Sequence, residues 1–139
     1  MGDYLMSLIK ANNITNTTGG IPTVKSQQLI PTAWVNVQEN YTIRDSEGVS
    51  SVSDITGGQL LVSFTTAMAN TNYAVVATCS TEVSGNTGLV AMVHTSHTGV
   101  APLTPATTGV RISTVRLGLA DAAEVDSPYT MVVVMGGQA

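Results

Sequence analysis

The fold class that the sequence predicts is all-β, an antiparallel β-sandwich, and three observations predict it. From Ala33 onward, apolar residues recur at every second position, as a strand with one buried face requires. Segments with this period follow one another at short spacing, separated by turns that contain Gly and Asn. Helical periodicity is confined to residues 120–124, which have room for one helical turn and are too few to change the class.

Eight strands are expected along the chain, at residues 34–38, 41–44, 49–55, 59–64, 73–80, 89–95, 110–117 and 129–135. The third and fourth form the clearest hairpin, because the intervening Gly57 and Gly58 tolerate the positive φ of a tight turn. In the fourth strand, Leu60, Val62 and Phe64 share one face, which we expect to be buried. Residues 96–109 contain two glycines and two prolines and should form a projecting loop.

The last expected strand is apolar on both faces. Residues 131–135 read Met-Val-Val-Val-Met, whereas a strand with one wet face should alternate with polar residues. In an antiparallel fold, this pattern indicates a strand that is covered on one side by a second sheet and on the other by another subunit. We therefore expect a trimer contact here.

The first 31 residues differ from the rest. A short apolar run at residues 5–9 is followed by a stretch rich in Asn, Thr and Gly, and then by Pro22 and Pro31. This composition favours extended or polyproline II backbone over helix, since proline lacks a donor and restricts the residue before it. We expect residues 1–31 to be an extended N-terminal attachment arm and residues 32–139 to be a β-sandwich knob domain.

Composition points to association between subunits. Only 10% of the 139 residues are charged, against about 25% in a typical soluble domain. Aromatic residues make up 4%, and the mean hydropathy is +0.24. Part of the apolar surface should therefore meet other copies of the chain, and we expect a homotrimer.

Several classes of function are disfavoured by charge and length of apolar runs. The net charge is −4 with five Lys plus Arg, so no basic stripe can neutralise nucleic-acid phosphates. The apolar run at residues 131–135 is far below the roughly 20 residues of a spanning helix, so no membrane insertion is expected. The first ten residues lack the pattern of a secretory signal, which indicates synthesis in a cytoplasm.

No constellation of reactive side chains stands out, and we expect no catalytic residue, no metal site, no cofactor and no enzyme activity. Cys79 is the only cysteine and is expected to be a buried, unreactive thiol. His94 and His97 are too few for a metal site, which needs three or four ligands, unless a trimer supplies three copies of each. We expect them to be solvated or strand-end histidines.

The carboxylates Asp45, Glu47 and Asp54 raise the question of a glycan depolymerase. Such an enzyme needs two carboxyl groups about 5–9.5 Å apart across a sugar, and residues 44–48 read instead as a charged turn between strands. Trp34 and Tyr41 are candidates for stacking on sugars, but aromatic residues on half-buried strands favour a place in the core or an interface.

Five passages of the chain, in order, carry a resemblance to a known family. They are residues 33–37 (AWVNV), 41–46 (YTIRDS), 49–55 (VSSVSDI), 61–68 (LVSFTTAM) and 72–76 (NYAVV). The series resembles the stretches AWVNF, TIRDS, NVSSITD, TVNFTTAM and NYAVV of tail-fibre proteins of marine and cyanobacterial tailed phages. Residues 9–24 resemble the short attachment leader that often precedes such modules.

The resemblance implies a virion structural protein, a trimeric tail fibre or knob that binds the host surface, glycan or protein, through exposed loops. It implies no catalytic residue. Many relatives carry the module at the end of a long shaft, so the alternative is a capsid head fibre or decoration protein that docks to other virion proteins through residues 1–31. In either case the expected location is the virion, assembled in the cytoplasm of a host bacterium.

Overall fold

The computed structural model describes residues 23–24, 27–28, 31–80, 88–94, 105–117 and 123–137. The chain divides into two units, residues 1–30 and 31–139. In the first unit, β1 (Thr23–Val24) pairs antiparallel with β2 (Gln27–Gln28). Of the expected arm, residues 1–22, 25–26 and 29–30 lie outside the described residues. No helix in these ranges is long and apolar enough to cross a membrane.

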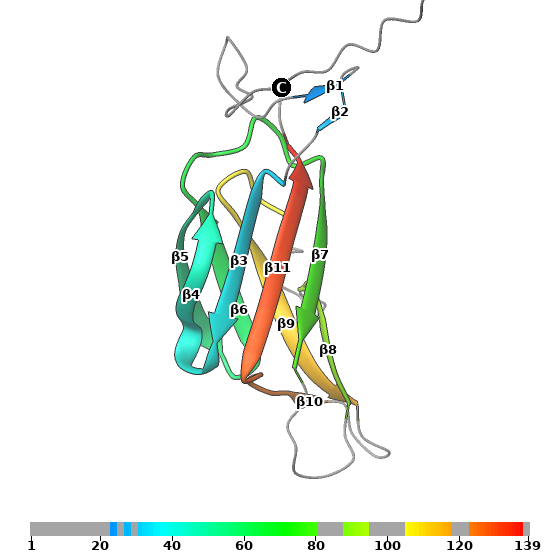
Figure 1. Ribbon diagram of the computed structural model, residues 1–139. Coiled ribbons are helices and arrows are strands. Elements are labelled where there is room, and N and C mark those ends of the chain that lie inside the picture. Colours follow the sequence, from blue (N-terminus) through cyan, green and yellow to red (C-terminus); the bar gives the residue numbers. More distant parts are fainter. Residues whose placement is uncertain are drawn as a thin grey trace, which may run out of the picture. The chain divides into compact units, whose positions relative to one another are not determined.

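The second unit is built from strands, and all eight expected ones are present (Figure 1). They are β3 (Ala33–Gln38), β4 (Thr42–Glu47), β5 (Val49–Thr56), β6 (Gln59–Phe64), β7 (Tyr73–Cys79), β8 (Gly88–Val93), β9 (Gly109–Leu117) and β11 (Tyr129–Gly136). A 3-10 turn, η1 (Glu39–Tyr41), joins β3 to β4, and a short strand, β10 (Ala123–Glu124), precedes β11.

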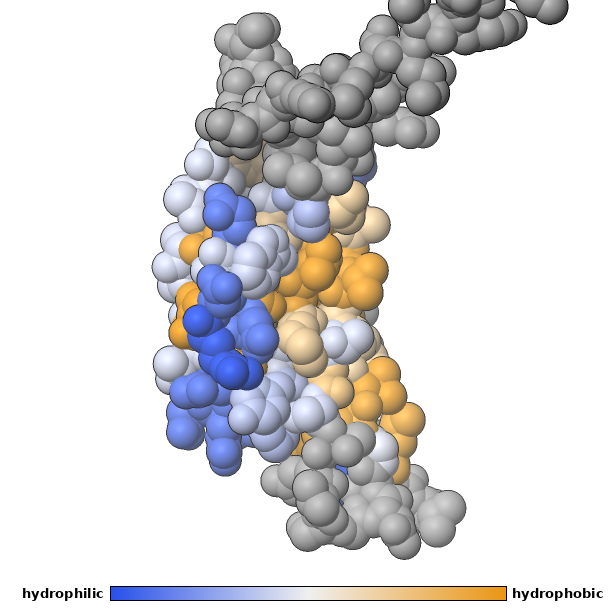
Figure 2. Space-filling model, in the orientation of Figure 1, coloured by the Kyte–Doolittle hydropathy of each residue, from blue (hydrophilic) through white to orange (hydrophobic). Residues whose placement is uncertain are grey.

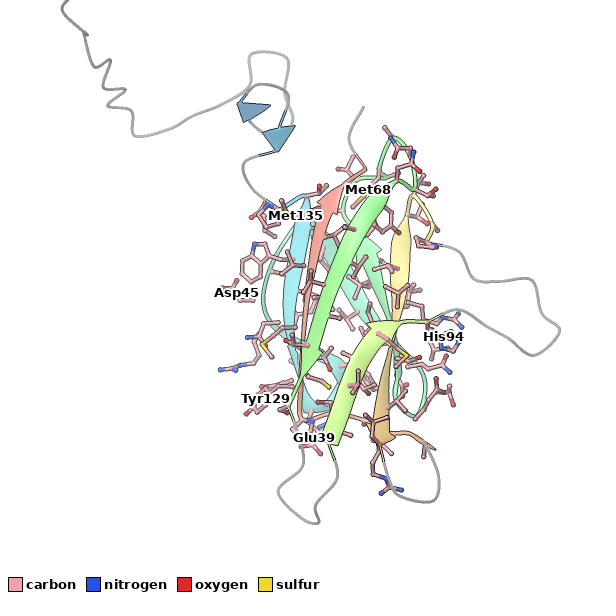
Figure 3. All side chains as sticks on the ribbon, turned by 90° about the vertical axis from the view of Figure 1, so that its right-hand side faces the viewer. Glu39, Asp45, Met68, His94, Tyr129 and Met135 are labelled. Atoms are coloured by element: carbon pink, nitrogen blue, oxygen red, sulfur yellow. The ribbon has the colours of Figure 1, made fainter. Side chains whose placement is uncertain are left out.

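The strands form two sheets with antiparallel pairing throughout. One sheet has the order β4-β3-β11-β7. In the other sheet, β5 pairs with β6, and β6 pairs with the first half of β9. The short strand β10 pairs with residues 115–116 of β9, and β8 pairs with residues 112–117 along the other edge of β9. The two sheets lie face to face as layers (Figure 3), so the expected antiparallel sandwich is confirmed.

The core lies between the four central strands, β3, β11, β6 and β9. Each presents alternate side chains to it, as a period of two requires. The buried apolar residues from these strands are Ala33, Val35, Val37, Leu60, Val62, Phe64, Val110, Ile112, Val132 and Val134. Burial of each valine or larger side chain contributes roughly 1.5–3 kcal/mol, so this alternation fixes which face of each strand is inward.

The prediction of a charged turn at residues 44–48 is wrong, because most of this segment belongs to a strand. Thr42–Glu47 is an edge strand that pairs with β3, and only Gly48 links it to β5 in the other sheet. Charged side chains suit this strand because it is an edge, where they hinder pairing with other chains. Gly48 has φ +70°, and a Cβ there would lie 2.6 Å from the carbonyl oxygen of Thr32.

The expected helical turn at residues 120–124 is also wrong where the structure describes it. Ala123 and Glu124 pair with Arg116 and Val115 of β9 as strand β10. The backbone N–H of Val125 then donates to the carbonyl of Thr114 at 3.0 Å. For Ala123 and Glu124, tertiary pairing with an open stretch of β9 edge therefore outweighs a weak helix preference.

Candidate functional site: two apolar patches and a polar cluster

The outer face of the β4-β3-β11-β7 sheet carries a contiguous apolar surface. Strand register aligns Trp34, Val133 and Val76 as direct neighbours on β3, β11 and β7. Met131 and Met135 lie on the same face of β11, two positions before and two positions after Val133. We call these five residues the first patch: Trp34, Val76, Met131, Val133 and Met135.

The first patch is open to solvent in the single chain. Val76 is 61% exposed and Met131 38% exposed, while the other three members are half-buried. Figure 2 shows orange over β11 and β7 and a blue strip along β4. An apolar surface that continues across neighbouring strands and has a polar border is typical of an interaction site, whereas isolated exposed apolar residues are ordinary.

The border of the first patch is charged. Glu47 lies opposite Trp34 on the neighbouring strand, and Asp45 lies opposite Asn36. The Arg44 guanidinium carbon lies 5.3 Å from the centre of the Tyr129 ring, a cation–π arrangement at one end of the sheet. Figure 3 shows Asp45 and Tyr129 projecting from this face of the sandwich, and His94 on the opposite side.

The other sheet carries a separate apolar surface on its own outer face, at the edge formed by β8. Val90 lies opposite Val115, and Met92 and Leu117 flank this pair on the same side of β8 and β9. Leu117 is 54% exposed and Met92 45% exposed. We call these four residues the second patch: Val90, Met92, Val115 and Leu117. The two patches differ in residue content.

A polar cluster borders the second patch. The Ser113 hydroxyl donates to Glu124 Oε1 at 2.9 Å, and the Gln59 amide donates to Glu124 Oε2 at 2.5 Å. His94 Nδ1 lies 2.5 Å from Ser113 Oγ and 3.4 Å from Glu124 Oε1. Ser113 and Gln59 are buried, 2% and 8% exposed, although they point away from the core.

The cluster stabilises the ionised form of Glu124. Burial pushes the pKa of this carboxyl upward, but the hydrogen bonds from Gln59 and Ser113 and the nearby His94 outweigh it, so the net shift is downward. The carboxylate thus joins three strands: β6, β9 and the short β10 that carries it. Its contacts tie β10 to the sheet.

The same cluster does not have the geometry of nucleophilic catalysis. In a relay, the histidine bridges the serine and the acid through its two ring nitrogens. Here Ser113 and Glu124 both approach Nδ1 of His94, and the Ser113 hydroxyl is buried. Among the described residues, no three His, Cys, Asp or Glu side chains are grouped to hold a metal ion. His97 lies outside these residues.

The remaining candidates from the sequence fall in different places. Asp45 and Glu47 lie on β4 of one sheet, and Asp54 lies on β5 of the other sheet. Trp34 is part of the first patch. Tyr41 packs against the core, and its hydroxyl donates to Asp126; burial and then this carboxylate raise the pKa of Tyr41.

Cys79 is half-buried at the end of β7. Burial raises the pKa of its thiol, against a smaller lowering effect of Ser127, so the thiol form is favoured over the reactive thiolate. This agrees with the expectation of an unreactive cysteine, although the side chain is less buried than expected.

The part of the first patch that lies on β11 was predictable from the sequence, because β11 is apolar on both faces. The second patch and the polar cluster were not predicted. Gln59 and Glu124 are 65 positions apart, and no local pattern marks them as neighbours. Most of the loop at residues 96–109 lies outside the described residues.

Searches against protein-family models, curated proteins and solved structures find no match to the chain.

Proposed function

We propose that the protein is a structural component of a tailed-phage virion, a homotrimeric fibre tip or knob that attaches to the host surface. The observation that carries this proposal is the presence of two different apolar patches on one weakly charged chain. The ordered motif series adds support, because its five passages fall on consecutive strands, β3 to β7, and the segments that join them.

The two patches favour a ring of subunits over a two-fold dimer. A two-fold dimer uses one surface twice, whereas a closed ring of three joins two different surfaces head to tail. The first patch lies on the outer face of one sheet and the second on the outer face of the other. In the proposed trimer, the first patch of each copy packs against the second patch of the next.

The proposed trimer also explains the composition. Burial of apolar area contributes roughly 25 cal/mol per Å², and a lone subunit leaves both patches in water. Three copies bury all of them with one kind of contact. Residues 1–31 are proposed to attach the trimer to other virion proteins, and exposed loops to contact the host. A capsid head fibre would use the same trimer, and imaging of labelled particles distinguishes the two locations.

Charge substitutions in each patch test this arrangement. Val76→Glu in the first patch and Leu117→Glu in the second each place a carboxylate in the proposed contact, which costs several kcal/mol if it stays buried without a partner. We expect each variant alone to sediment as single chains. Ile55→Glu is the matched control, because Ile55 is 40% exposed but belongs to neither patch.

Mixing the two variants gives the sharper result. The Val76→Glu chain keeps an intact second patch, and the Leu117→Glu chain keeps an intact first patch, so one contact can form between them. We expect pairs containing one chain of each kind. If Leu117→Glu assembles like the unmodified protein, the head-to-tail arrangement is wrong.

A further inference from the structure

A polar hollow lies at the end of the sandwich where η1 joins β3 to β4. It has a volume of about 260 Å³, and its lining comes from two segments that meet there. These residues are Gln38, Glu39, Asn40, Pro128 and Tyr129. Figure 3 shows Glu39 and Tyr129 at this same end. The hollow is smaller than pockets for drug-sized ligands, which hold about 300–1,000 Å³.

The backbone around the hollow is held firmly. The Glu39 N–H donates to the Pro128 carbonyl at 2.7 Å and so joins the two lining segments. The Tyr129 carbonyl accepts from the Ser80 N–H at 2.9 Å and from the Ser127 hydroxyl at 2.7 Å. The lining side chains therefore stand on a fixed frame, which lowers the entropy lost when a ligand binds.

The turn itself is conformationally strained. Asn40 and Tyr41 have φ of 65° and 59°, in the left-handed region that residues other than glycine seldom adopt. The bond from the Tyr41 hydroxyl to Asp126, and the bond from the Gly58 N–H to the same carboxylate at 2.6 Å, hold this shape. Strain of this kind, fixed by distant contacts, is common at binding sites.

The polar groups of the lining are available to a ligand. Within the described part of the chain, the side chains of Gln38, Glu39 and Asn40 make no hydrogen bond, and all three are exposed. Together they offer two amides and one carboxylate. Tyr129 is 42% exposed, and Arg44, which lies over its ring, is not part of the lining.

We propose that this hollow binds one neutral pyranose ring of a glycan. The exposed edge and hydroxyl of Tyr129, whose ring face Arg44 covers, lie beside the sugar, while amides and a carboxylate pair with neighbouring sugar hydroxyls as donors and acceptors. An anionic ligand would meet the Glu39 carboxylate, and an apolar ligand would leave three polar side chains unpaired. The inference rests on the proposed surface attachment and gives it a ligand class and a site outside both patches.

The test uses the full-length ¹⁵N-labelled protein titrated with the methyl glycosides of glucose, galactose and mannose. At least one should shift the amide signals of residues 38–40 and Tyr129, saturating at millimolar concentration. Glu39→Gln should weaken this binding about tenfold, the usual effect of losing one charged hydrogen bond. Glu47→Gln, the same change outside the hollow, should leave it unchanged.

The inference is overturned if none of the three glycosides shifts these signals, if the shifts lie elsewhere, or if Glu39→Gln binds like the unmodified protein. Sedimentation of the same samples separates this result from the proposed assembly. A trimer that binds no sugar overturns the inference alone. A single chain that binds sugar at residues 38–40 supports the inference and overturns the proposed trimer.

Discussion

Glu124 should make the free energy of unfolding depend on pH in the acid range. Its pKa in the folded state is below the ordinary value of 4.5, so its contribution to stability is complete above that value and is lost as pH falls through the folded pKa. The free energy of unfolding should fall as pH drops below about 4.5, and Glu124→Gln should reduce this fall.

Urea titrations at fixed chain concentration measure this effect, because assembly also contributes to stability. Glu39→Gln is the matched control, since Glu39 makes no side-chain hydrogen bond in the part of the chain that the structure describes. An acid response in Glu124→Gln as steep as that of the unmodified protein would contradict the role assigned to the cluster.

Tyr73 ties the start of β7 to the segment before β9. Its hydroxyl donates to the carbonyls of Ala106 at 2.9 Å and Gly109 at 3.2 Å, and its ring meets Phe64 edge to face at 5.8 Å. Tyr73→Phe keeps the ring and removes these bonds, so the free energy of unfolding should fall by about 1 kcal/mol.

Deprotonation of Tyr73 at alkaline pH should also remove the stabilisation that its hydroxyl provides. Burial raises the pKa of Tyr73 to about 12 from 10.0, so the effect of its neutral hydroxyl persists below pH 10.0 and is lost as pH rises through about 12. Urea unfolding at neutral pH checks the prediction, with Tyr129→Phe as the control at a more exposed tyrosine. Equal stability of Tyr73→Phe and the unmodified protein would show that the two bonds contribute nothing.

These residue-scale features lay beyond sequence reasoning. His94 was expected to be a solvated or strand-end histidine, and it does follow the last residue of β8. Its neighbours Ser113 and Glu124 come from other strands, 19 and 30 positions away, and register alone brings them together. A period of two assigns each side chain to a face but does not say which strands are adjacent.

At the scale of elements, the β5–β6 hairpin depends on one of its two glycines. Gly58 has φ +77°, and a Cβ there would lie 2.4 Å from the Val125 nitrogen. Gly58→Ala should therefore lower the free energy of unfolding by about 1–3 kcal/mol from backbone strain, with the close contact adding to it. Thermal or urea unfolding measures the loss.

Gly57 supplies the matched control. A Cβ at Gly57 would meet nothing within 4 Å, and its φ is not positive, so Gly57→Ala should change the free energy of unfolding by less than about 0.5 kcal/mol. If the two alanine variants are equally stable, the hairpin does not need the left-handed residue, and this explanation of the turn is wrong.

The elements themselves were largely predictable. Apolar periodicity and turn residues identified all eight strands, because each strand packs at least one side chain against or into the core, and the glycine pair located the hairpin. The errors came where local sequence was ambiguous. Residues 44–48 resembled a charged turn, but residues 44–47 belong to an edge strand. Ala123 and Glu124, expected at the end of a helical turn, form a short strand instead.

At the scale of the whole molecule, the sequence predicted the sandwich but only half of the proposed assembly surface. The double-sided apolar pattern of β11 indicated the first patch, since a covered strand needs no polar face. The second patch combines β8 with the end of β9, and its members alternate with residues that face inward, so each strand alone looks ordinary.

Sedimentation equilibrium of the unmodified protein measures how many copies of the chain associate. The two apolar patches should join copies head to tail, and in the proposed closed ring the mass in solution is three times the 14.4 kDa of one chain over a wide range of concentration, whereas an open chain of copies would grow with concentration. Folded single chains of 14.4 kDa that remain dispersed at high concentration would show that the two patches do not join copies of the chain.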